Sequence, residues 1–127
     1  MIALMDLRPG NYVHPAMPGK YNEPDTGRYL RILSIDLLAK QVTAKADGEQ
    51  EIHTLNADAI YPCALDVLMQ VIGGLSFGEH SILLQDGAVA IIHENGSLFH
   101  IPHIQYVHQF QNLFRSLTGQ EFPYNLK

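Results

Sequence analysis

Residues 28–62 read RYLRILSIDLLAKQVTAKADGEQEIHTLNADAIYP, and this stretch decides the fold predicted for the first half of the chain. Residues 28–35 carry apolar side chains on both alternating faces, a pattern that predicts a strand covered over most of its length. Two further strands, QVTAKA and EQEIHTL, flank Asp47-Gly48, a dipeptide that predicts a two-residue hairpin because both positions take positive φ. A 3₁₀ turn after Leu55 then leads into an extended Ile60-Tyr61-Pro62.

The residues before this stretch complete a recognisable order of elements. Pro9-Gly10 predicts a turn, and a short strand is expected around Tyr12 and Val13. Residues 15–27 are rich in Pro, Gly, Asn and Asp, which predicts a long surface loop. A short strand, a long loop, three meandering strands, a 3₁₀ turn and a last short strand are the order of an SH3-like small barrel. We therefore expect residues 1–63 to form a barrel of that kind.

The second half of the chain, residues 64–127, predicts two helices and a meander. The run LDVLMQVIGG fits a short buried helix with Asp66 as N-cap. Turn signals at Asp86-Gly87 and Asn95-Gly96 separate HSILLQ, AVAIIHE and SLFHI into three antiparallel strands. From Tyr106 to Thr118 apolar residues recur at helical spacing, and Gly119 follows as the expected end. The predicted fold class is therefore α+β, mostly β, with both halves packed as one compact unit.

Composition limits the class of protein. The chain has 127 residues, of which 46% are hydrophobic, and this is enough for one domain with a real core. No apolar run approaches the roughly 20 residues that span a bilayer, and Asp6 stands where a secretory signal carries basic residues. The single cysteine, Cys63, excludes an internal disulfide and is typical of a small buried apolar residue. We expect a cytoplasmic protein with no membrane contact and no cofactor.

Charge is divided unevenly along the chain. The formal net charge is −5, yet residues 1–48 hold six of the eight Lys and Arg side chains. Residues 46–114 contain no Lys or Arg at all, although six of the seven histidines lie there. Any positive charge in that span therefore depends on pH.

Two stretches resemble a known group of proteins. The segment YVHQFQNLFRSLTGQEF, residues 106–122, is similar to the C-terminal signature Tyr-Val-His-x-Leu-Gln-Asn-Leu-Tyr-x-x-Leu-Thr-Gly-x-Glu of a family of small uncharacterised proteins from Bacteroidetes genomes and their prophages. LRPGNYV, residues 7–13, resembles the Leu-Arg-x-Gly-Asn-x-Val opening of the same family. This chain departs at Phe110 and Phe114, where Leu and Tyr are usual, and at Asp66, where Thr is usual. The resemblance implies an origin linked to mobile elements, but no activity.

The first candidate site is a cluster of histidines on the meander. If both hairpins have two-residue loops, His80 lies opposite His93 and His100 lies diagonal to His93, on one sheet face. Three histidines and a water form a known zinc arrangement. The same face carries many aliphatic residues and no evident carboxylate partner, so a structural or interface role is the favoured interpretation.

The second candidate is nucleic-acid binding by the first half. Four cations are expected on neighbouring strands, with tyrosines available for stacking: Arg28, Arg31, Lys40 and Lys45. Interspersed acidic residues make an ordinary solvated sheet face the alternative interpretation.

The third candidate is a protein-binding surface on the last helix and tail. It is rich in side-chain amides, poor in charge and extended by aromatics, as interfaces are: His108, Gln109, Gln111, Asn112, Arg115, Phe122 and Tyr124. The alternative is that the amides are simply solvated and the tail folds back on the domain.

The sequence carries none of the familiar catalytic motifs, such as HExxH, GxSxG or a P-loop. The favoured interpretation is thus a non-enzymatic interaction or assembly protein, acting on a protein partner or by self-association. Nucleic-acid binding is the alternative, and a histidine metal site is the third hypothesis.

Overall fold

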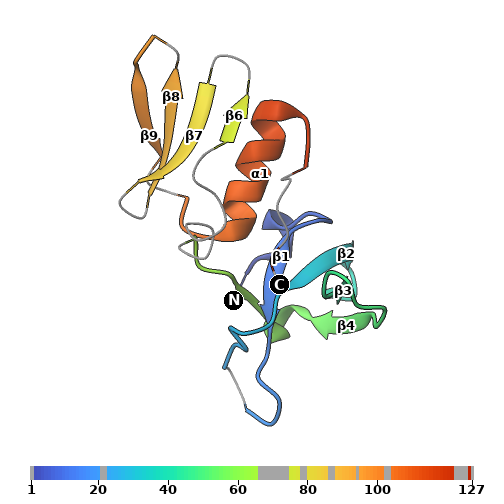
Figure 1. The fold of residues 1–127 in the computed structure, drawn as a ribbon. Coiled ribbons are helices and arrows are strands. Elements are labelled where there is room, and N and C mark those ends of the chain that lie inside the picture. Colours follow the sequence, from blue (N-terminus) through green and yellow to red (C-terminus); the bar gives the residue numbers. More distant parts are fainter. Residues whose placement is uncertain are drawn as a thin grey trace.

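The computed structural model describes residues 2–20, 23–65, 75–77, 80–85, 88–93, 95–101, 104–121 and 126. These residues form two antiparallel sheets, and one α-helix lies between them (Figure 1). The predicted α+β, mostly β class is confirmed. The short helix predicted from Asp66 lies outside the described residues.

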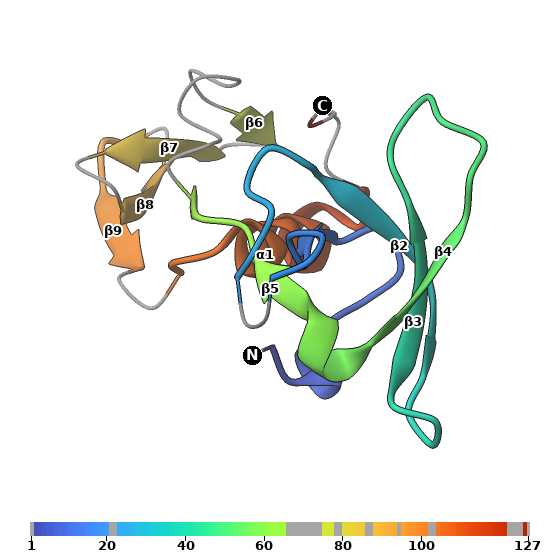
Figure 2. The ribbon, with the colours of Figure 1, turned by 90° about the horizontal axis from the view of Figure 1, so that it is seen from below.

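The first sheet has five strands in the order β4-β3-β2-β1-β5. They are β1 (Tyr12–Pro15), β2 (Leu30–Asp36), β3 (Gln41–Lys45), β4 (His53–Asn56) and β5 (Ile60–Pro62), with the 3₁₀ turn η2 (Ala57–Ala59) between the last two. This order of elements along the chain was predicted, and the structure pairs the fifth strand with the first. The prediction of a closed barrel is wrong. The sheet curves strongly (Figure 2), but its outer strands β4 and β5 are not paired with each other in the part described.

The connection between β3 and β4 also differs from the prediction. A two-residue hairpin at Asp47-Gly48 would start β4 at Glu49 and pair Ala44 with Glu51. In the structure β4 starts at His53, which pairs with Ala44. Gly48 has a φ of +84°, whereas Asp47 does not have positive φ. The physical reason is that the Asp47 carboxylate binds the Arg31 guanidinium, which holds this residue toward β2.

β2 is interrupted by a bulge. The pairing with β3 shifts between Ile32 and Ser34, so one extra residue, Leu33, stands between them. The prediction that this strand is covered over most of its length is wrong beyond the bulge, because Leu33 and Ser34 are exposed.

The second sheet has four strands in the order β6-β7-β8-β9. They are β6 (Leu75–Phe77), β7 (His80–Gln85), β8 (Ala88–His93) and β9 (Leu98–Ile101). The predicted meander corresponds to β7, β8 and β9, and β6 is an additional strand that the sequence reasoning missed. The helix α1 (Val107–Thr118) was predicted, as was its end at Gly119, which has a φ of +73°.

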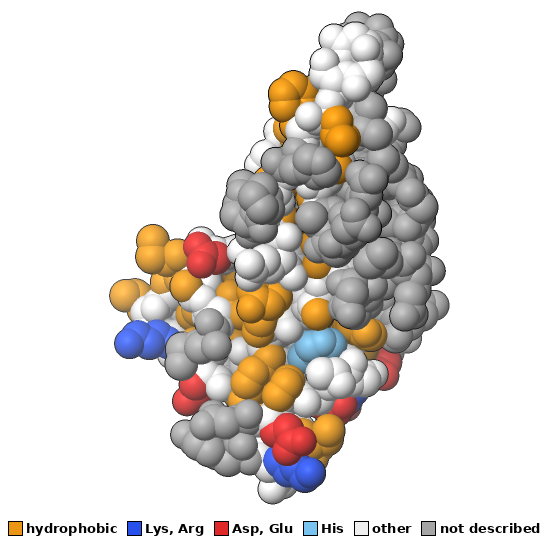
Figure 3. Space-filling model, turned by 90° about the vertical axis from the view of Figure 1, so that its left-hand side faces the viewer, with side chains coloured by type: hydrophobic (Ala, Val, Ile, Leu, Met, Phe, Trp, Pro, Cys, Tyr) orange, Lys and Arg blue, Asp and Glu red, His pale blue; other side chains and the backbone are white. Residues whose placement is uncertain are grey.

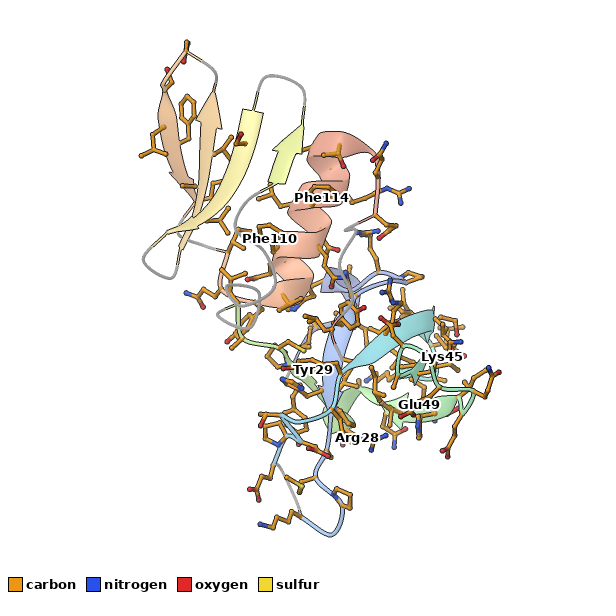
Figure 4. The ribbon with its side chains drawn as sticks, viewed as in Figure 1. Arg28, Tyr29, Lys45, Glu49, Phe110 and Phe114 are labelled. Atoms are coloured by element: carbon orange, nitrogen blue, oxygen red, sulfur yellow. The ribbon has the colours of Figure 1, made fainter. Side chains whose placement is uncertain are left out.

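Two hydrophobic cores share strand β1. Tyr12 belongs to a core between β1, α1 and the second sheet, which we call the shared core: Tyr12, Cys63, Leu65, Val89, Ile104, Val107, Phe110, Phe114 and Leu126. The next residue, Val13, belongs to the inner core of the first sheet: Ile2, Leu7, Val13, Leu30, Ile32, Val42, Ala44 and Ile60. Successive side chains on a strand point to opposite faces, so this one strand carries both cores. In Figure 4, Phe110 and Phe114 extend from α1 toward the second sheet.

The N-terminal segment folds over the first sheet before β1 begins. Residues Leu4–Asp6 form the 3₁₀ turn η1, and Ile2 and Leu7 are buried in the inner core. The predicted turn at Pro9-Gly10 is confirmed, because the N–H of Asn11 donates to the carbonyl oxygen of Arg8 at 3.1 Å. Gly10 has a φ of +97°, as required at the third position of a type II turn.

In the described part of the chain no helix has the length and apolar character needed to cross a membrane.

Gly10→Ala should destabilise the fold by more than Gly48→Ala. Both glycines have positive φ, which costs about 1–2 kcal/mol for a residue with a Cβ. Only at Gly10 would the added Cβ also meet another group, the Glu121 Oε2 at 3.2 Å, since nothing lies within 4 Å of Gly48. Urea unfolding of both variants measures the difference, and equal losses would contradict the close approach of Glu121 to the turn.

Candidate functional site

The amide of Gln111, on α1, is inserted against the start of β1. Its Oε1 accepts the N–H of Tyr12 at 2.9 Å, and its Nε2 donates to the carbonyl oxygen of Gly10 at 2.9 Å. On the opposite side the same segment is bonded to Ile32, which accepts the N–H of Gly10 and donates to Asn11. The side-chain amide of Gln111 thus makes the two hydrogen bonds to the backbone of this segment that a neighbouring strand would make. It is 2% exposed.

Asn112, the next residue of α1, binds the N-terminal turn. Its Oδ1 accepts hydrogen bonds from the Arg8 Nε and the Asn11 Nδ2, both at 2.9 Å. Its Nδ2 donates to the carbonyl oxygen of Asp6 at 3.0 Å. All hydrogen-bonding atoms of this amide are therefore used within the chain.

Arg115 and Arg8 converge on one carboxylate, that of Glu121. The two guanidinium groups lie 2.6 Å and 3.1 Å from its Oε1. All three side chains are between 31% and 47% exposed, so this cluster adds little to stability on its own.

These contacts correct the predicted protein-binding surface. His108 and Gln111 are 4% and 2% exposed, so the expected exposed amide face is wrong for both. Gln109 accepts the N–H groups of Gln105 and Tyr106 and so caps the start of α1. Phe122 and Tyr124 lie outside the described residues. Sequence reasoning failed here because the amides cover the polar backbone of a turn about a hundred residues away, and periodicity cannot distinguish that surface from solvent.

Residues of the two stretches 7–13 and 106–121 contact each other in the structure. Arg8 and Asn11 of the first stretch bind Asn112 of the second, and Gly10 lies against Glu121. Arg8, Asn11 and Asn112 thus stabilise contacts within the chain. Their presence is therefore not by itself a sign of a ligand site.

The four predicted nucleic-acid contacts do not form one free cationic patch. Arg31 makes two hydrogen bonds to the Asp47 carboxylate at 2.9 Å, and its guanidinium carbon lies 4.7 Å from the Tyr12 ring centre. Lys40 lies in the β2–β3 turn just before β3 begins, and Lys45 is the last residue of that strand, so the length of β3, about 13 Å at 3.3 Å per residue, lies between them. Arg28 lines a small hollow of about 150 Å³ together with Asp47 and Glu49, which offset its charge. In Figure 4, Arg28 lies in the segment before β2 and Lys45 at the end of β3.

The Tyr12 hydroxyl completes the Arg31 cluster. It donates to Asp47 and accepts from Arg31, and both side chains are mostly buried. Burial, followed by the hydrogen bond to Asp47, raises the pKa of Tyr12 to about 12, and the same carboxylate raises the pKa of Arg31. The cluster therefore keeps one protonation state across the neutral range and holds β1, β2 and the β3–β4 connection together.

A second hollow lies beside the β2–β3 turn. It has a volume of about 350 Å³ and is lined by Ala39, Lys40, Asn56, Ala57 and Asp58. Its one lysine and one aspartate carry opposite charges, so the hollow does not select either sign of ligand.

The strand register tests the alignment of the three histidines. His80 pairs with His93 and Gln85 with Ala88, as predicted. His100 pairs with Ala90, whereas a two-residue loop at Asn95-Gly96 would pair it with Ile91. A shift of one residue moves every position of β9 to the other face of the sheet. The register therefore does not align His100 with His80 and His93, as the prediction requires. Gly96 has a φ of +91°, as in three-residue hairpin loops that end in a left-handed residue.

Metal binding by His80, His93 and His100 stays a hypothesis, since their side chains lie outside the described residues. Among the side chains that are described, no group of three or more His, Cys, Asp or Glu converges on one point.

Cys63 is fully buried in the shared core, as predicted. Burial raises the pKa of its thiol to about 12, so the thiolate is absent at neutral pH.

Strand β9 exposes apolar side chains on the second sheet. It is an outer strand, and Leu98 and Phe99 are 45% and 59% exposed. Figure 3 views the molecule from this side and shows hydrophobic side chains at the surface there. Sequence reasoning placed the strand correctly but did not identify it as an open edge, because its neighbours along the chain do not show what lies beside it in space.

No protein-family model matches the chain, and searches of curated proteins and of solved structures found no match either.

Gln111→Leu should destabilise the protein by about 2–4 kcal/mol, because it leaves the Tyr12 N–H and the Gly10 carbonyl without their partner. Gln120→Leu is the matched control, since Gln120 is exposed. Urea unfolding measures both variants. A loss at Gln111 no larger than at Gln120 would contradict the role given to this amide.

Stability should fall with acid through His108. Its Nδ1 is buried without a hydrogen-bond partner, and burial lowers its pKa below the ordinary 6.5, against the opposing effect of Asp6. The folded state therefore binds this proton less readily than the unfolded chain does. The resulting stability is fully present above pH 6.5 and is lost as the pH falls to the lowered value. In His108→Gln, the free energy of unfolding should depend less steeply on pH below 6.5, and an unchanged slope would refute the assignment.

Proposed function

We propose that the chain is a non-enzymatic interaction or assembly protein that binds its partner by strand addition at β9. The observation that carries the proposal is the exposure of Leu98 and Phe99 on an outer strand without charge. An outer strand presents unpaired N–H and C=O groups that can bond to a further strand.

The other outer strands with described side chains carry features that discourage such pairing. Glu49 and Glu51 lie in the segment leading into β4. β5 ends at Pro62, which has no N–H to donate. Charged residues and proline are the usual protection of sheet edges; β9 itself contains neither, and Glu94 and Pro102 flank it in the sequence.

Phe99 lies on the same face of the second sheet as residues of the shared core. Phe99 pairs with Ile91, and Ile101 pairs with Val89, so the four side chains belong to one sheet face. Val89 is fully buried, and Ile91 and Ile101 pack against the shared core. Phe99, in contrast, is 59% exposed. A strand added beyond β9 would cover it and extend the same apolar surface.

The first sheet supports a binding rather than a catalytic role. We propose that its strand order is an open variant of the SH3-like layout, whose members commonly bind peptides. Layout alone does not decide function, and the proposal depends on β9. Nucleic-acid binding is the weaker proposal, because Arg31 is engaged by Asp47 and Arg28 shares its hollow with two acids.

The experiment is photo-crosslinking in the cells that naturally make the protein. A photoreactive phenylalanine is placed at Phe99, and as control at Leu38, which is 98% exposed on the β2–β3 turn of the other sheet. We expect an adduct of one defined mass from position 99 that disappears when Leu98→Lys is introduced in the same chain. Absence of any adduct at position 99, or an adduct that Leu98→Lys leaves unchanged, would overturn the proposed function.

A further inference from the structure

We infer that the strand added to β9 belongs to a second copy of this chain, paired antiparallel about a two-fold axis. This inference rests on the proposed function, since it names the partner of the same edge. It follows from the charge, the symmetry and the uncovered apolar surface of β9.

The first argument is charge. Residues 95–101 have no Asp, Glu, Lys or Arg, so the edge offers no charge for a partner to complement. A basic partner would be drawn instead to the acidic residues elsewhere on a chain with a net charge of −5. The strand that fits this edge is itself uncharged and apolar, and β9 of another copy has that composition.

The second argument is symmetry. Two identical strands that pair antiparallel are related by a two-fold axis. The outer backbone groups of each copy then bond to those of the other, and no open edge remains at β9. Such a pairing closes at two chains and joins two four-stranded sheets into one. It also covers part of Leu98 on one face of the joined sheet and part of Phe99 on the other, which removes exposed apolar surface from water.

The third argument concerns strength. β9 has four residues, so the two strands exchange about four backbone hydrogen bonds. This contact is smaller than a standard protein interface, and a weak, concentration-dependent dimer is expected. Two copies of charge −5 also repel each other at low ionic strength, so added salt should strengthen the dimer. Binding of an oppositely charged partner would weaken with salt instead.

The test is sedimentation equilibrium of the purified chain over a wide concentration range, at low and at high NaCl. We expect the mass to rise from 14.2 kDa to twice that value, and the dissociation constant to fall as NaCl increases. Leu98→Lys and Phe99→Lys should each weaken the dimer at least tenfold, because a charge on the edge opposes pairing. Leu38→Lys, the same kind of change at an exposed leucine of the other sheet, should leave the dissociation constant unchanged.

A second measurement does not depend on variants. Among Leu98–Ile101, the amide hydrogens that point away from β8 should exchange more slowly at high protein concentration than at low concentration, while those of β4 should not change. A chain that stays monomeric at all concentrations, or a dimer that all three lysine variants weaken equally, would overturn the inference.

The crosslinking experiment separates the two proposals. An adduct from position 99 with twice the chain mass supports both of them. An adduct of any other mass keeps the proposed function and overturns the second copy as its partner. No adduct overturns both.

Discussion

The structure depends on one amide that takes the place of a strand. Gln111 bonds to Gly10 and Tyr12 on the side of the chain that β2 leaves open, so the start of β1 is held from both sides. Because Tyr12 and Val13 point into different cores, the position of this strand sets both the inner core and the shared core. A hydrogen bond from a side chain is usually a modest contribution to stability, but here its loss leaves two backbone groups unsatisfied in the interior.

A polar layer surrounds this amide and joins the N-terminal turn to α1. Asn112 binds Arg8, Asn11 and Asp6, and Glu121 lies between Arg8 and Arg115. The helix is consequently covered on two sides, by apolar side chains of the second sheet and by the polar turn. The amides that suggest a binding surface on α1 instead bind the N-terminal turn and the start of β1, and the partner surface that we propose is the edge of β9.

Turn residues and periodicity predicted most of the helices and strands. The connections, the register and the burial of polar side chains depend on contacts between residues far apart in the sequence. The order of elements along the first half, the meander and the helix with its Gly119 end all follow from turn residues and periodicity. The turn at Asp47-Gly48 forms as predicted, closed by the hydrogen bond from the Glu49 N–H to the Ala46 carbonyl oxygen, but the start of β4 could not be predicted, because Asp47 is also held by Arg31. The β8–β9 register differs by one residue, which a turn dipeptide does not fix. The burial of Gln111 was hidden because its partner Tyr12 lies 99 residues away.

That separation of 99 residues has a consequence for synthesis of the chain. At about 5–20 residues per second, the ribosome completes Gln111 roughly 5–20 s after Tyr12. The inner core needs only residues 2–60, so the first sheet can assemble early, while the backbone of Gly10 and Tyr12 still bonds to water. During this interval the strand that serves both cores has one side free, and the nascent chain is open there to chaperones or to mispairing. Arrival of α1 closes that side, because Gln111 then bonds to the backbone of Gly10 and Tyr12.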